Sequence, residues 1–261
     1  MTMVRVLWVF FRLGVLNELQ YRVNFVVQLF QSLLGLATSL ATLAVVFAQT
    51  SAVNGWRSPE LLAVLGTYFL VGGAIRLVIQ PSMQQLMEDV RQGTLDFTLT
   101  KPQDAQLLVS IRQVQVWKLV DVAMGLGVVI VALMQMQATI GPLQALSFLV
   151  ALLCGGAIVY SFLLALTTCA FWFVRVENIL VIFESVYEAG RWPVGIYPGW
   201  LRLMLTFIVP VAFAITVPAE AMTGRLTWPV LLGAMALAGA MLVGSRLFWR
   251  LGVRRYSGAS S

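Results

Sequence analysis

The chain has 261 residues, of which 60% are hydrophobic and 11% charged, against about 25% charged residues in soluble domains. Its net charge is +6, but the arginines are scattered among apolar runs, which argues against a nucleic-acid-binding protein. The sequence has no histidine, and its two cysteines would lie roughly 22 Å apart on one helix, which argues against a disulfide or a metal centre. We expect one all-α integral membrane domain, 1–261, with six transmembrane helices.

The predicted elements begin with an amphipathic helix. Residues 1–22 mix aromatic and aliphatic side chains with arginines, which favours a helix lying in the membrane interface; a basic flank of the first span is the alternative. The next apolar runs predict spans over Val23–Ala48 and Leu61–Gln80, joined by a turn-rich loop. Glutamine, serine and threonine in the first span predict that one of its sides faces protein.

A polar break follows the second span. From Met83 to Gln92 it places Leu86, Met87 and Val90 at helical spacing, and Gly93 suits the end of a helix. We expect a short helix exposed on the inner face of the membrane, with an apolar ridge and acidic flanks. An ordinary loop is the alternative.

Three further spans are predicted over Val114–Met134, Leu146–Phe173 and Trp228–Phe248. Two shorter apolar stretches, Val176–Val194 and Leu201–Val217, compete for the place of the fifth span. We expect the first to cross and the second to form a re-entrant hairpin bent at its internal proline, within a region covering 195–220. Non-helical backbone at membrane depth is tolerated only where protein or water surrounds it.

Basic residues determine the predicted orientation. Most arginines and lysines fall near the two ends of the sequence and in the loops after the second and fourth spans. The opposite side holds Arg57, Arg191, Arg202 and Arg225. This bias predicts that both termini are cytoplasmic, and it allows only one of the two short stretches to cross fully.

A charged stripe occupies the first of those stretches. Its members share one face of a helix and are Glu177, Glu184, Glu188 and Arg191. Charges at membrane depth are costly and point to function. Three interpretations stay open: the lining of a hydrophilic path, a contact with a partner permease, or the wet face of a helix near the surface. Arg76 and the Lys118–Asp121 pair are candidate partners, although we expect Lys118 and Asp121 to snorkel near a span end.

Motifs of catalysis are absent from the sequence. It contains no G-x-x-x-x-G-K-[ST] phosphate loop and no G-x-S-x-G nucleophile motif, so we do not expect an enzyme or a nucleotide-hydrolysing chain. An intramembrane enzyme would have to use carboxylates such as Glu184 and Glu188. An ion-coupled secondary transporter and a non-catalytic membrane scaffold also stay open, although the internal repeats typical of secondary transporters are not found.

Three segments carry a resemblance to a known family. The sequence RQGTLDFTLTKP at Arg91–Pro102 resembles the G-x-L-D-x-L-L-x-K-P segment between the second and third spans of ABC-2 type permeases, the membrane subunits of ATP-binding-cassette transporters. Arg191–Arg202 with Phe207–Pro210 resembles the external region before their last span. The ending Arg254–Ser261 is similar to that of an uncharacterised bacterial subgroup.

The resemblance implies an exporter permease with an interfacial helix, six spans, a cytoplasmic coupling helix within 82–104, and a re-entrant region. It implies ABC ATPase partner subunits that bind ATP and Mg, no cofactor in this chain, and a second permease chain, identical or a paralogue. The location implied is the bacterial cytoplasmic (inner) membrane. The coupling residues would be Leu86, Met87, Glu88, Asp89, Arg91, Gly93, Asp96, Lys101 and Pro102.

Overall fold

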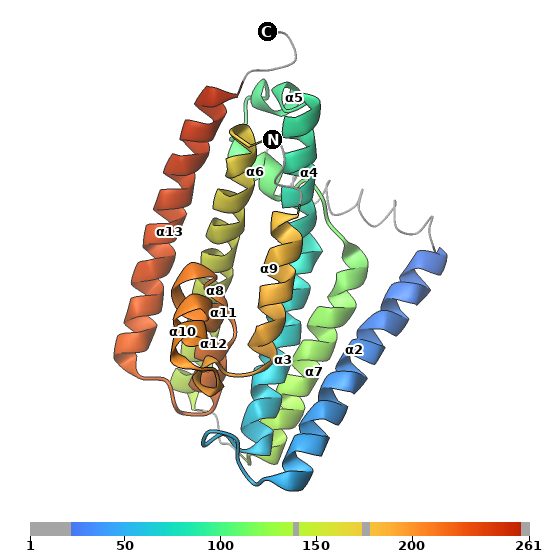
Figure 1. The fold of residues 1–261 in the computed structure, drawn as a ribbon, viewed down its shortest axis with the longest axis vertical. Coiled ribbons are helices and arrows are strands. Elements are labelled where there is room, and N and C mark those ends of the chain that lie inside the picture. Colours follow the sequence, from blue (N-terminus) through green and yellow to red (C-terminus); the bar gives the residue numbers. More distant parts are fainter. Residues whose placement is uncertain (1–21, 138–140, 174–177, 257–261) are drawn as a thin grey trace.

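The computed structural model describes residues 22–137, 141–173 and 178–256, and these form a bundle of long helices (Figure 1). Apart from an isolated bridge between Val53 and Trp56, the regular elements of the described residues are helical. Five segments are long and apolar enough to cross a membrane: Phe25–Gln49, Ser58–Gln92, Val116–Gln135, Pro142–Phe171 and Trp228–Arg255. The prediction of an all-α membrane protein is confirmed. The predicted interfacial helix, 1–22, lies almost wholly outside the described residues.

Four of the predicted spans are confirmed with small shifts at their ends. They are α2 (Arg22–Gln49), α7 (Leu119–Gln135, preceded by the 3-10 turn Val116–Lys118), α8 (Pro142–Thr168, followed by the 3-10 turn Cys169–Phe171) and α13 (Trp228–Arg255). Proline at the first turn starts α8 and α13, where its missing N–H removes no helical hydrogen bond. In Figure 1, α2 stands at the edge of the bundle, tilted away from the other helices.

The second span differs from the prediction at its inner end. α3 (Ser58–Ala74), a π-helical turn (Ile75–Ile79) and α4 (Gln80–Gln92) form one continuous 35-residue helix, so no separate short helix begins at Met83. Pro81 lies inside this helix and cannot donate to the carbonyl of Leu77. The backbone N–H of Gln115 donates to that carbonyl instead (2.8 Å), so the chain passes the proline without a break.

α3 is the central helix of the bundle. In its most apolar window 67% of the residues are buried, against 6% for α2. Its contact with α7 depends on glycines: a Cβ added at Gly125 would lie 2.3 Å from the backbone nitrogen of Leu70, and one at Gly66 would lie 2.7 Å from that of Val129. Small residues of this kind let helices approach closely in a membrane.

The region before α13 enters the bundle and turns back. α9 (Ile179–Tyr187) leads through the 3-10 turns Glu188–Arg191 and Val194–Ile196 to α10 (Gly199–Leu203) and the π turn Met204–Ile208, and then to α11 (Val211–Ala214) and α12 (Thr216–Met222). The helices on either side of Pro210 are bent by 72°, the geometry of a broken span or a re-entrant loop.

Contacts at the two ends of this region show where its path begins and ends. The side-chain amide of Asn54 donates to the carbonyl of Gly195 (2.8 Å), and Arg225 donates to that of Gly55 (2.7 Å), so the region starts and finishes beside the same loop. Between them the chain reaches Gly155, halfway along α8, where an added Cβ would lie 2.7 Å from the Cα of Ala214. This path has the form of a hairpin bent at Pro210, and the re-entrant placement expected from the sequence stays a prediction.

The expected fifth span, Val176–Val194, is α-helical over Ile179–Tyr187 and continues as a 3-10 turn. It is therefore too short to count among the five long helices of the described residues. Pro193 explains where the helix stops, because its ring cannot continue the helical hydrogen bonding.

Candidate functional site

The polar break forms a tip at one end of the bundle, where α4 turns into α5 (Asp96–Leu99; Figure 1). Gly93 ends α4 in the left-handed conformation (φ 71°), as the sequence predicts. The N–H of Thr94 then donates to the carbonyl of Asp89 (2.9 Å), which fixes the reversal. Leu95 is fully buried, whereas Phe97 is 76% exposed. The tip is therefore a folded element with an aromatic side chain facing outward.

Several predicted coupling residues are buried, so the expected apolar ridge is not exposed on the surface. Leu86 is fully buried, and Met87 and Asp89 are nearly so, because α4 packs along α8 instead of lying free on the membrane face. Asp89 forms an ion pair with Arg112 and accepts a hydrogen bond from the Gln85 amide (2.8 Å). These residues hold the tip in place and cannot be its contact surface.

The accessible members of the predicted set lie around Phe97. Arg91, Lys101 and Pro102 are exposed, while Glu88 is half-buried and forms an ion pair with Arg91 (2.6 Å). Asp96 is half-buried at the first position of α5. We call the exposed surface the tip surface; it comprises Arg91, Gln92, Phe97, Thr100, Lys101, Pro102 and Gln103. The sequence pattern marks Phe97 only as one apolar residue in a polar segment, so the pattern alone does not single it out.

A polar network connects the tip to the other helices. Arg246 on α13 forms an ion pair with Asp104 and donates to the side-chain carbonyl of Gln106 (2.8 Å). The Gln106 amide donates to the Tyr160 hydroxyl on α8 (3.1 Å), and that hydroxyl also hydrogen-bonds Ser110 (2.8 Å). The Arg246 guanidinium, together with the N–H of Leu107, lowers the pKa of Asp104. A displacement of the tip would therefore reach α8 and α13 directly.

In the part of the charged stripe that the structure describes, each carboxylate forms an ion pair with an arginine of the same chain. Glu184 pairs with Arg76 on the π turn (3.5 Å) and Glu188 pairs with Arg191 (3.6 Å). Each of these two carboxylates thus has its own arginine. Glu177 lies outside the described residues.

Lys118 and Asp121 do not snorkel, so the expectation from the sequence is wrong for this pair. Their side chains are 14% and 5% exposed, and they form an ion pair (3.1 Å) inside the bundle. The Lys118 ammonium also lies 3.9 Å from the centre of the Trp117 ring, a cation–π contact. Burial is favourable here because Lys118 lies at the first turn of α7, where Asp121 is one turn away and the ring covers the cation.

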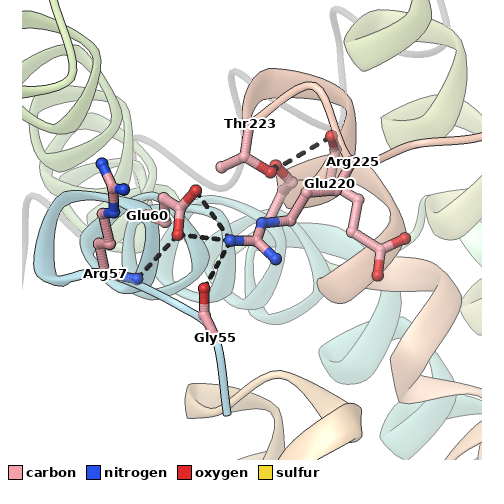
Figure 2. Close-up of polar contacts among 7 residues, drawn as sticks. Gly55, Arg57, Glu60, Glu220, Thr223 and Arg225 are labelled. Atoms are coloured by element: carbon pink, nitrogen blue, oxygen red, sulfur yellow. Dashed lines mark hydrogen bonds and ion pairs between the residues drawn. The ribbon is translucent and has the colours of Figure 1, made fainter. Parts of the chain in front are cut away.

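A second ionic cluster, which the sequence did not reveal, joins the start of α3 to the turn after α12 (Figure 2), at the end of the bundle opposite the tip (Figure 1). Glu60 accepts two hydrogen bonds from one Arg225 nitrogen (3.0 and 2.8 Å) and one from the N–H of Arg57 (2.7 Å). The Arg225 guanidinium also lies 4.7 Å from the Trp56 ring centre. The cluster ties the turn after α12 to the start of α3. The residues are 165 positions apart, so no local pattern could have shown it.

A comparison with protein families gives a match. The sequence model described as ABC-2 family transporter protein matches residues 33–260. The chain belongs to this family. It is thus a multi-pass membrane protein of the ABC-2 transporters, a family of transport subunits whose usual partners are ABC ATPases. No curated protein and no solved structure matches the chain. Among the described residues, no group of histidine, cysteine and acidic side chains could hold a metal ion.

Proposed function

We propose that the chain is the permease subunit of an ABC exporter in the bacterial cytoplasmic membrane, and that a partner ATPase subunit binds the ATP and Mg. The observation that carries this proposal is the tip surface: an ABC-2 chain exposes one large aromatic side chain, Phe97, at the end of a helix continuous with its central span. Aromatic side chains surrounded by polar groups are typical anchors of protein interfaces.

The tip faces the cytoplasm in this proposal, because the charge bias places the loop after the second span inside. ATP-driven movement of the ATPase would push on Phe97 and Lys101. The continuous α3–α4 helix would carry that movement toward the membrane, and the Arg246 network would carry it to α8 and α13.

A second permease chain, identical or a paralogue, would complete the transporter, with the substrate passing between the two. Glu184, Glu188 and Arg191, with Glu177, would line that path or contact the partner permease.

Purification from native membranes and reconstitution in vesicles test the proposal. The chain should copurify with an ATP-binding subunit, and replacement of Gly93 by valine should abolish ATP-coupled transport, because valine disfavours positive φ. Gly127→Val is the matched control, since nothing lies within 4 Å of a Cβ at that helix position. A complex that lacks any nucleotide-binding subunit would overturn the proposal.

A further inference from the structure

A polar recess opens between the central span, the start of α7 and α9. Its volume is about 280 Å³, larger than the ~150 Å³ cavity that suffices for benzene. Cations, one carboxylate, amides and an aromatic ring line it: Arg76, Lys118, Glu184, Gln84, Gln115 and Trp117. A recess with this lining is suited to a polar ligand that carries charge.

The charges around the recess balance. Arg76 pairs with Glu184, and Lys118 pairs with the buried Asp121. Arg76, Lys118 and Glu184 line the same recess. Glu184 is the more exposed member of its pair, at 41% against 22% for Arg76. A ligand of one sign would leave an opposite charge unmatched, whereas a ligand with both a phosphate and an ammonium group would satisfy both.

The depth of the recess indicates the source of such a ligand. Arg76 lies 18 positions after Ser58 in the continuous helix, or about 27 Å along it, close to the ~30 Å thickness of the hydrocarbon core. Gln84 lies two turns further toward the tip, and Trp117 is of the residue type that concentrates at membrane interfaces. With the start of α3 taken as the opposite edge of the hydrocarbon core, the recess lies at the headgroup level of the leaflet on the tip side.

We propose that this recess binds the headgroup of a phosphatidylethanolamine-type lipid, with the phosphate between Arg76 and Lys118 and the ammonium against Glu184. A primary ammonium can donate hydrogen bonds to the carboxylate, whereas the trimethylammonium of phosphatidylcholine cannot, and phosphatidylglycerol has no cation to place there. The site does not require that lipid be the transported substrate, although it shares Glu184 with the proposed path or permease contact.

Native mass spectrometry of the detergent-purified chain tests the site, with phosphatidylethanolamine, phosphatidylcholine and phosphatidylglycerol added separately. Phosphatidylethanolamine should be retained more tightly than the other two. Arg76→Gln and Lys118→Gln should each weaken its retention by about tenfold or more, since tenfold is the lower end of the value of a hydrogen bond to a charged group. Glu184→Gln should abolish the preference for phosphatidylethanolamine over phosphatidylglycerol.

Two further variants separate binding from folding. Arg250→Gln removes an exposed cation of α13 that does not line the recess and should leave retention unchanged. Gln84→Trp removes no charge but fills the recess from an exposed position, and it should also displace the lipid. Equal retention of the three lipids, or retention in the recess variants equal to that of Arg250→Gln, would overturn the proposal.

Discussion

Asp89 and Arg112 form an ion pair beneath the tip, and replacing the arginine should destabilise the protein more than replacing the aspartate. The Asp89 side chain is 4% exposed and the Arg112 side chain 37%. Replacing Arg112 with alanine leaves a charged carboxylate inside the bundle, where Gln85 and Thr94 still donate hydrogen bonds to it but no cation pairs with it. Breaking a buried pair in this way costs about 3–5 kcal/mol. Asp89→Asn keeps an acceptor in place and leaves an arginine that water can reach, so it should cost ~1 kcal/mol.

Thermal unfolding in detergent measures the difference. At roughly 2–4 °C per kcal/mol for a chain of this size, Arg112→Ala should lower Tm by about 6–20 °C and Asp89→Asn by ~2–4 °C. The double variant Asp89→Asn/Arg112→Ala should be more stable than Arg112→Ala alone. Arg250→Ala, an exposed control, should change stability by less than ~0.5 kcal/mol. If Asp89→Asn proved as damaging as Arg112→Ala, the carboxylate would not be the buried member of the pair.

Three other predictions concern the tip and the central helix. Phe97→Ala should weaken capture of the ATPase in a pull-down without lowering Tm, whereas Leu95→Ala should cost ~2–5 kcal/mol of folding free energy because it empties a buried site. Gly125→Ala should lower Tm because its Cβ would meet the Leu70 backbone at 2.3 Å, and equal Tm values for Gly125→Ala and Gly127→Ala would refute the close contact of α3 and α7. The pKa of Asp104 is lowered in the folded protein, so its charge stabilises the fold at neutral pH. The Tm of wild type should therefore exceed that of Asp104→Asn at neutral pH, and the difference should disappear as pH falls through the folded pKa, below the ordinary ~3.9. A difference that grows on acidification would contradict this sign.

Most of the long helices could be predicted because an apolar run of span length has few alternatives in a membrane. α2, α7, α8 and α13 follow the hydropathy of the sequence, with ends shifted by up to seven residues, as at the C-terminal end of α13. The role of Gly93 is also readable from the sequence, since a glycine after a helical pattern marks its end.

The polar break could not be predicted correctly because its pattern fits both an exposed ridge and a buried one. Leu86 and Met87 lie at helical spacing in either case, and only the packing of α4 along α8 shows that they point inward. Pro81 suggests an end to the second span, but the π turn before it and the N–H of Gln115 compensate for the missing hydrogen bond. The Glu60–Arg225 cluster and the Arg246 network join residues far apart in the sequence, which a single sequence does not reveal.

The most direct test of the central claim is photocrosslinking from the tip surface in native membranes. A photoreactive amino acid at Phe97 should capture a protein that mass spectrometry identifies as an ATP-binding-cassette ATPase, and the same group at Trp200, an exposed residue of α10 on the external side in this proposal, should not. Capture of the ATPase at Trp200 and not at Phe97, or of none at either position in an actively transporting membrane, would contradict the assignment of the tip as the ATPase contact.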